Sequence, residues 1–150
     1  MSNVHPLPKP EPRIDHVWIP PDEVSEQWDL VQAGVEEVAQ YGDHWRAEDV
    51  YMALRQGTSH LYVIMVDGVY AGFVVVTPTR GHDGPTLHVW IAYAVPGGPP
   101  LHPATVARFK DWATAIKARR ILFTSPRKGW DRLARRLGFT PTLVTYELEV

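Results

Sequence analysis

Two short stretches of this sequence carry groups that can hold a phosphate. Residues 93–98 end an apolar run, and Gly97 and Gly98 in that stretch offer backbone N–H groups that can approach an anion closely. Residues 124–128 end a second apolar run, and their hydroxyl and basic side chains can donate to phosphate oxygens. The four donors are Thr124, Ser125, Arg127 and Lys128. An ordinary surface turn is the alternative interpretation of the second stretch.

Two residues near the first stretch can transfer protons. His88 can act as a general base, and Tyr93 can act as a general acid or contact a substrate. Strict alternation along residues 86–95 puts His88, Trp90 and Ala92 on one face of a strand, with Val89, Ile91 and Tyr93 on the other. A hydrogen-bonded sheet histidine and a packed tyrosine are the alternative roles.

The elements that position these residues are read from periodicity. Residues 86–95 predict a buried strand, 104–118 a helix, 119–124 a second strand and 130–137 a second helix. A strand, helix and strand this close together form a right-handed unit with parallel strands. Ligands of such sheets bind beyond the carboxyl ends of the strands, near helix N-termini. The two stretches are therefore expected to lie side by side at an anion site.

The first half of the chain has a different pattern. Residues 14–19 predict a strand, 22–41 and 46–55 two helices, and 60–66 and 69–77 a hairpin around Asp67-Gly68. Residues 78–85 predict a loop, and residues 142–150 a last strand with one wet face. We expect an α/β fold with a mixed sheet, antiparallel in its N-terminal half and parallel in a C-terminal βαβ half, with helices on both faces.

Two regions differ in their organisation. Residues 1–13 hold four prolines and predict an extended arm, either without internal order or laid along a partner or second subunit. Residues 14–150 predict a single domain.

Composition limits the class of protein. The chain has 150 residues, 45% of them apolar, and no cysteine, which excludes disulfides and thiolate chemistry. The histidines lack zinc-ligand spacing, so no metal is expected. No apolar run is long enough to cross a membrane and no signal peptide is evident, so no membrane association and a cytoplasmic location are expected.

Charge is unevenly distributed. The net charge of −2 argues against nucleic acid as a partner, yet residues 105–136 carry ten of the fifteen basic side chains. This segment would attract a small polyanion such as a nucleotide-bearing cofactor. A solvated basic face is the alternative.

The element order resembles that of the GCN5-related N-acetyltransferases over most of residues 14–150. The segment Trp130-Asp-Arg-Leu-Ala-Arg-Arg-Leu-Gly-Phe139 looks like the family's amphipathic helix ending in Leu-Gly-Phe. The hairpin followed by Tyr70-Ala-Gly-Phe-Val74 looks like the family's third strand, and residues 87–95 look like its central strand. More narrowly, residues 118–130 are similar to acetyltransferase-like proteins encoded by bacteriophages.

The resemblance implies an acyl-coenzyme-A-dependent N-acyltransferase that acts on an amine of a small molecule or a protein. Acetyl-coenzyme A, or another acyl-coenzyme A, would lay its pantetheine arm along Tyr93, Ala94 and Val95. Its phosphates would lie near Gly97, Gly98 and residues 124–128.

The sequence also departs from the family. The loop after the central strand lacks the family's leading Arg or Gln and contains prolines 99, 100 and 103, which remove backbone donors. Ala134 stands where the family's general-acid Tyr is usual, and Gly129 stands where an Asn is common. The alternative function is a catalytically degenerate protein that binds a protein partner, a host enzyme or virion component if it is phage-encoded. A homodimer is compatible with either function.

Overall fold

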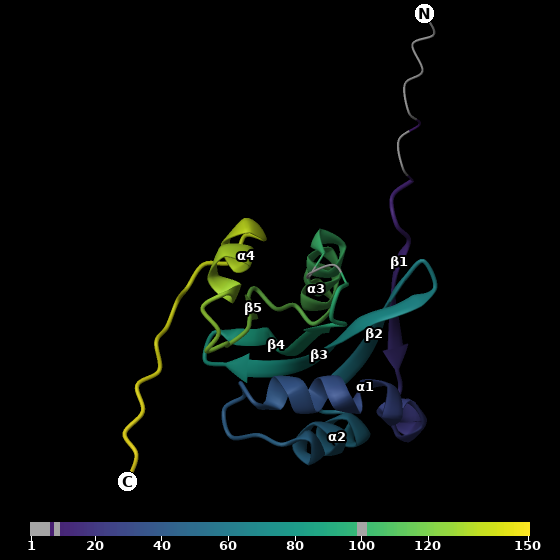
Figure 1. Cartoon of the computed structure of the whole chain (residues 1–150). Coiled ribbons are helices and arrows are strands. Elements are labelled where there is room, and N and C mark those ends of the chain that lie inside the picture. The colour runs from purple at the N-terminus through teal and green to yellow at the C-terminus, as the bar shows by residue number, and fades with distance from the viewer. Residues whose placement is uncertain (1–6, 8–9, 99–101) are drawn as a thin grey trace, which may run out of the picture.

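The computed structural model describes residue 7 and residues 10–98 and 102–150 (Figure 1). A five-stranded sheet has the order β1-β2-β3-β4-β5, antiparallel from β1 to β4 and parallel between β4 and β5. The predicted mixed α/β fold is confirmed. The strands are β1 (Ile14–Ile19), β2 (His60–Val66), β3 (Val69–Gly81), β4 (Gly84–Ala94) and β5 (Ile121–Leu122). The helices are η1 (Pro21–Glu23), α1 (Val24–Ala39), α2 (Ala47–Gln56), α3 (Pro103–Ala115) and α4 (Trp130–Arg136).

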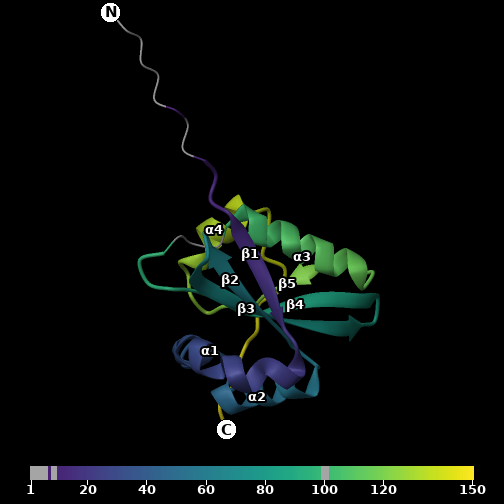
Figure 2. The ribbon, with the colours of Figure 1, turned by 90° about the vertical axis from the view of Figure 1, so that its right-hand side faces the viewer.

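Helices cover both faces of the sheet. Figures 1 and 2 show α1 and α2 on one face and α3 on the other, with α4 beside α3. The apolar stripe of α1 packs with Phe73, Val75 and Ile91 of the sheet, while Phe109 of α3 packs with Val74. Burial of these two apolar sets is the main favourable contribution to folding.

The β2–β3 hairpin turns as the sequence predicted. Asp67 and Gly68 both have positive φ, at 50° and 78°, as a two-residue hairpin turn requires. The Asp67 side chain accepts a hydrogen bond from the Arg13 N–H at 2.9 Å, and the Asp67 N–H donates to the Arg13 carbonyl at 2.8 Å. The turn therefore also holds the chain that enters β1.

The predicted loop at residues 78–85 is wrong. β3 continues to Gly81 and β4 starts at Gly84, with pairs such as Thr79↔Thr86 between them. The two prolines at positions 78 and 85 lie inside these long strands. Proline is tolerated in a strand where its missing N–H would not have joined the ladder.

A bulge interrupts the regular alternation of β4. Val75 pairs with Ile91 and Val76 with Val89, so Trp90 is an extra residue on β4. Val89 packs on the α3 side, whereas Trp90, Ile91 and Tyr93 all pack on the α1 side. The alternation predicted for residues 88–93 is therefore wrong beyond Trp90, because a bulge reverses parity.

β5 is much shorter than predicted. It pairs with β4 only at Leu87↔Ile121 and His88↔Leu122. The part of β4 beyond His88 has no strand on that side within the described residues. Two neighbouring strands thus separate toward the end of β4.

The predicted last strand is also wrong. Residues 140–150 have no regular secondary structure, and Leu143, Tyr146 and Leu148 are about nine-tenths exposed, at 91%, 91% and 88%. Figure 1 shows this segment leaving the body of the molecule beyond α4. One side-chain contact, between His44 and Glu147 at 3.5 Å, joins it to the loop after α1. The alternating pattern alone does not make a strand, because a strand is stable only when a partner satisfies its backbone.

The proline-rich arm lies mostly outside the described residues. Leu7 and residues 10–13 have no regular secondary structure, and Leu7 is 91% exposed. The single-domain prediction for residues 14–150 stays a prediction.

Removing residues 140–150 is expected to change the free energy of unfolding by less than about 0.5 kcal/mol, since these side chains bury almost nothing. Urea denaturation followed by circular dichroism measures the change. In the native chain, backbone amides 142–150 should exchange with deuterium as fast as those of a free peptide, while the buried Val74 amide stays protected. Slow exchange in the tail, or a loss of several kcal/mol, would show that the segment pairs after all.

Candidate active site

A cavity of about 440 Å³ lies on the α3 side of the sheet, between α3 and α4, and reaches past the end of β4 to α1. It opens beside the part of β4 beyond His88, which β5 does not reach. The sheet supplies a mainly apolar wall from β2, β3 and β4. The residues of that wall are Ile64, Val66, Ala71, Val74, Ala92, Tyr93 and Ala94.

A missing side chain on α1 shapes the α1 side of the cavity. A Cβ atom at Gly34 would lie 2.8 Å from the ring of Tyr93 and 2.7 Å from that of Phe73. The Tyr93 ring therefore packs directly on the backbone of α1, with its centroid 5.3 Å from that of Phe73. Glu37 follows Gly34 by one helical turn and also lines the cavity.

Tyr93 has a raised pKa. Burial is the largest cause, and the charge of Glu37 and a hydrogen bond with the Glu37 side chain add to it. The phenol of Tyr93 thus stays protonated at neutral pH and can donate a hydrogen bond or a proton.

Tyr70 lies close to this pair. Its hydroxyl is buried and has no hydrogen-bond partner in the part of the chain that the structure describes. Burial, with a smaller effect of Tyr93, raises the pKa of Tyr70 to about 12. A buried hydroxyl without a partner is costly, so this group is either a local weakness or a contact for a ligand.

The N-terminus of α3 forms the opposite side of the cavity. His102 caps the helix, because its Nδ1 accepts a hydrogen bond from the Ala104 N–H at 2.9 Å. The buried Thr105 lies 2.9 Å, Oγ1 to Nε2, from His16 of β1. Burial, more than the nearby Arg108, lowers the pKa of His16, so the ring is neutral at pH 7. The start of α3 is thereby fixed to the first strand.

The same cap limits anion binding at this helix. The N–H groups of Thr105 and Val106 point to the His102 carbonyl at 2.9 Å and 3.4 Å. An anion at the helix N-terminus would have to displace the His102 ring from the Ala104 N–H. The prolines were predicted to reduce the number of backbone donors in this loop. The His102 ring now also competes with an anion for the Ala104 N–H.

The turn before α4 closes the third side. Arg127 places its guanidinium 4.5 Å from the ring centroid of Tyr41, so the turn meets the end of α1. The Ser125 hydroxyl accepts a hydrogen bond from the Arg127 N–H at 3.2 Å, within the turn itself. Trp130 and Leu133 of α4 line the cavity, together with Gly129 just before the helix, whereas Ala134 does not.

The structure brings together only some of the residues expected at the site. Tyr93, Ala94 and Arg127 line the cavity. Outside its lining lie Val95, Gly97, Gly98, Thr124, Ser125 and Lys128. The Gly98 N–H donates to the Val95 carbonyl in a turn.

His88 is also outside the cavity lining. It is half-buried near the middle of β4, where burial lowers its pKa, and five residues of strand correspond to about 16 Å of chain before Tyr93. Its role as a base has no geometric support.

Among the lining residues that sequence reasoning missed, four have ionisable or hydroxyl side chains: Glu37, Tyr41, His102 and Thr105. A signal existed for Glu37, since it lies one turn after a glycine on the edge of the apolar stripe of α1. The other three depend on how α1 and α3 meet at the end of the sheet, which no local pattern encodes.

Two further observations concern the described residues alone. No group of three or more His, Asp or Glu side chains there is arranged to hold a metal ion. No helix there is long and apolar enough to span a bilayer.

Comparison with known proteins supports the fold. No protein-family model matches the sequence, and no curated protein matches it either. Among solved structures, an aminoglycoside N-acetyltransferase, AAC(6')-Iy, in complex with CoA has a TM-score of 0.69 at 18% identity, over 96% of this chain and 98% of that one. A ribosomal-protein-alanine N-acetyltransferase from Brucella melitensis biovar Abortus 2308 has a TM-score of 0.67 at 17% identity, over 92% and 99%.

A predicted acetyltransferase with acetyl-CoA from Clostridium acetobutylicum is also similar, with a TM-score of 0.64 at 10% identity over 91% of this chain and 96% of that one. At these identities the comparison shows the fold alone. The chain has the mixed-sheet fold of the GCN5-related N-acetyltransferases.

The Tyr70 hydroxyl yields a prediction about alkaline pH. Its pKa is higher in the folded protein than the ordinary 10.0, so its contribution is complete below pH 10 and is lost as the pH rises toward 12. We expect this loss to be about 1 kcal/mol, because the ring is only half-buried and solvent screens part of the effect. Tyr70→Phe should abolish the loss and leave stability at pH 7 unchanged or up to about 1 kcal/mol higher. Urea denaturation at pH 7 and pH 11 measures both, and Tyr146→Phe in the exposed tail is the control. A variant that is much less stable at pH 7 would mean that the hydroxyl has a partner.

Proposed function

We propose that this protein is an acyl-coenzyme-A-dependent N-acyltransferase. The observation that supports this best is the position of the cavity, at the point where β4 and β5 separate in a sheet of this fold. Structures similar to this chain have been solved with CoA or acetyl-CoA. The acceptor would be an amine of a small molecule or a protein, and the expected location is the cytoplasm.

The end of β4 is suited to hold an extended ligand. The Val95 N–H donates to the Ala71 carbonyl of β3. Because antiparallel strands alternate, the backbone groups of Ala94 then point away from β3, toward the side without a strand. A pantetheine arm has amide groups that can pair with this free edge as an added strand would. Of the three residues Tyr93, Ala94 and Val95, Ala94 would make the direct backbone hydrogen bonds with the pantetheine arm.

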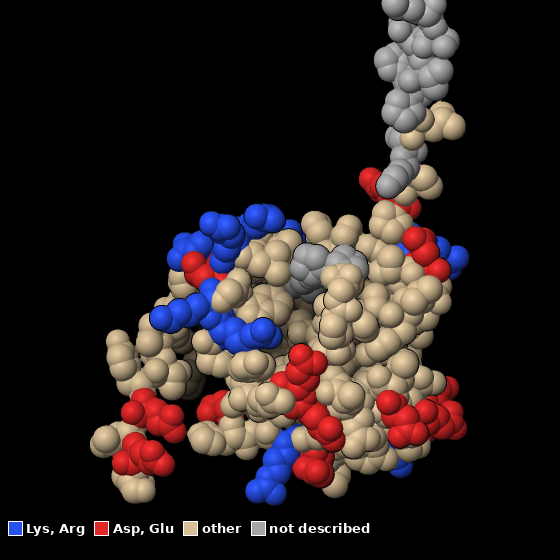
Figure 3. All heavy atoms as spheres, viewed as in Figure 1, with Lys and Arg blue, Asp and Glu red and all other residues tan. Residues whose placement is uncertain are grey.

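The phosphates of the cofactor would lie near Gly97, Gly98 and residues 124–128. Figure 3 shows basic side chains gathered over α4, on the same side of the molecule as this turn. Arg127 is the one Lys or Arg side chain among the cavity-lining residues of the described chain. Thr124, Ser125 and Lys128 would add donors once the turn adjusts to an anion.

Tyr93 is the residue we assign to proton transfer. Its protonated phenol lies in the cavity and can supply a proton to a leaving thiolate. The Ala134 side chain has no proton to donate. Ala134 does not line the cavity, whereas its neighbour Leu133 does. Positioned acid–base groups contribute roughly 10²–10⁴-fold, so we expect slow turnover on generic amines unless Tyr93 replaces the missing donor. His88 is retained only as a sequence-based candidate for the base.

One observation favours a second function. His102 occupies the backbone donor at the start of α3 that a phosphate would use. A protein of this fold that no longer binds a cofactor would act by binding a protein, a host enzyme or a virion component if the chain is phage-encoded. The proline-rich arm, or a second copy of the chain, would then contribute to that contact.

Binding of acetyl-coenzyme A separates these functions. At a concentration one hundred times Kd, a ligand stabilises the folded protein by about 2.7 kcal/mol, which thermal denaturation detects readily. Acyl transfer to a panel of amines, followed by thiol release, tests catalysis in the same samples. The absence of a thermal shift at millimolar acetyl-coenzyme A would remove the acyltransferase proposal.

The basic turn before α4 is tested by the double variant Arg127→Ala with Lys128→Ala. Removing two cations from a phosphate site should weaken acetyl-coenzyme A binding at least tenfold, and more strongly at low salt. Calorimetry at two salt concentrations measures the effect.

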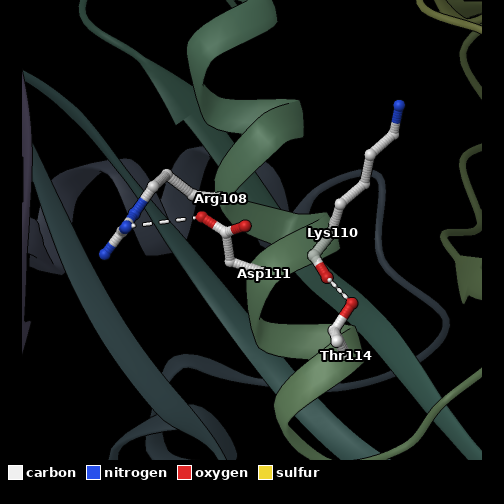
Figure 4. Close-up of polar contacts among 4 residues, drawn as sticks. All are labelled: Arg108, Lys110, Asp111 and Thr114. Carbon is white, nitrogen blue, oxygen red and sulfur yellow. Dashed lines mark hydrogen bonds and ion pairs between the residues drawn. The ribbon is translucent and has the colours of Figure 1, made fainter.

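The control for this test removes the same charge from α3 and its exit, by Lys110→Ala with Arg119→Ala. Figure 4 shows the Lys110 side chain pointing away from its helix, while its carbonyl accepts the Thr114 hydroxyl at 2.8 Å. Equal weakening in both double variants would mean that only the overall charge matters.

A further inference from the structure

The wall of the cavity nearest α1 carries the carboxylate of Glu37 and the phenol of Tyr93. Glu37 is the single carboxylate among the cavity-lining residues of the described chain. Glu37 and Tyr93 both line the cavity, and the Glu37 carboxylate is near enough to help raise the pKa of the Tyr93 phenol. An isolated carboxylate at a mainly apolar cavity is a strong point of attraction for a cation.

No internal cation satisfies this carboxylate. Within the residues that the structure describes, Glu37 takes part in no ion pair. Arg127, the cavity's guanidinium, lies over the Tyr41 ring instead. Glu37 is exposed at the mouth of the cavity, so a ligand from solvent can reach it.

The position of this pair is built into the packing. The Tyr93 ring is held against α1 because Gly34 has no side chain, and the Phe73 ring lies beside it against the same glycine. Glu37 lies on the same helix, α1, about one turn after Gly34. The aromatic ring is therefore fixed against the helix that carries Glu37, and the half-buried Tyr70 packs against the same apolar cluster as Tyr93.

The rest of the cavity is suited to an apolar body. Val38, Ile64, Val74 and Leu133 supply aliphatic surface, and the volume of about 440 Å³ is in the range of small-molecule sites. A ligand that matches the whole cavity has a positive charge at one end and a hydrocarbon or aromatic part at the other.

We propose that Glu37 and Tyr93 form the binding site for the protonated amino group of an apolar primary amine. The ammonium would donate hydrogen bonds to the Glu37 carboxylate and to the Tyr93 hydroxyl oxygen, with its carbon skeleton along α4 and the sheet. The inference rests on the proposed function, in which this amine is the acyl acceptor: the ammonium first loses a proton to water, its nitrogen then bonds to the acyl carbon, and the bond from that carbon to the sulfur of coenzyme A breaks. It narrows the acceptor class from amines in general to cationic amines with an apolar body.

The test measures binding of benzylammonium chloride to the full chain without cofactor, by NMR chemical-shift titration. Glu37→Gln keeps the shape of the side chain and removes its charge. It should weaken benzylammonium binding about fivefold or more, the effect expected from losing a partly exposed charge pair. Benzyl alcohol, which has the same body and no charge, should bind the native protein and the variant equally.

Glu36→Gln is the matched control. Glu36 is the preceding residue of α1, is exposed and accepts a hydrogen bond from Gln32 at 3.1 Å, outside the cavity. This variant changes the net charge by the same amount and should bind benzylammonium as the native protein does. Equal affinity of Glu37→Gln and the native protein, or no benzylammonium binding to the native protein at millimolar concentration, would overturn the inference.

The acetyl-coenzyme A thermal shift keeps this inference distinct from the proposed function. We expect Glu37→Gln to retain the shift, because Glu37 lies on the α1 side of the cavity. A native protein with Glu37-dependent amine binding and no response to acetyl-coenzyme A would contradict the acyltransferase proposal and leave the amine site intact. A normal thermal shift with acetyl-coenzyme A, without Glu37-dependent amine binding, would support the acyltransferase proposal and overturn the amine site.

Discussion

The bulge at Trp90 is the constraint on which the cavity depends. One extra residue in β4 puts Ile91 and Tyr93 on the α1 side, together with Trp90, and turns Ala92 to the α3 side. Without it, strict alternation from Val89 would put Tyr93 on the face covered by α3 and α4, away from Glu37. Bulges bend a strand and increase its twist, which agrees with the loss of β5 pairing only a few residues earlier. The bulge thus puts Tyr93 on the α1 side close to the place where β4 and β5 separate.

Much of the fold could be predicted, because its signals are local. The Asp67-Gly68 turn has residues that accept positive φ, and the apolar stripe of α1 repeats with helical period. The extent of each strand was harder to predict. The ladder between β3 and β4 runs through two prolines, and whether a proline fits depends on which way its missing N–H would have pointed.

The candidate site could be predicted only in part, for a related reason. Tyr93 and Ala94 end an apolar strand, and Arg127 follows another, so their approach follows from topology. Glu37 and His102 come from helices whose ends meet the sheet at an angle set by packing, such as the contact of Tyr93 with Gly34. The bulge itself has no sequence signature here, since Trp90 lies in an unbroken apolar run.

The backbone of Arg13 is bonded in both directions to Asp67. On either side of Arg13, Pro12 and Ile14 line the cavity. The hairpin turn therefore fixes residues 12–14, where the N-terminal segment joins β1, at the rim of the cavity. Any affinity tag or fused domain placed before residue 12 would emerge at that rim, close to where ligands must enter. A tag placed after residue 150 would instead extend from an exposed segment that supplies none of the cavity-lining residues, which makes it the safer choice for ligand-binding measurements.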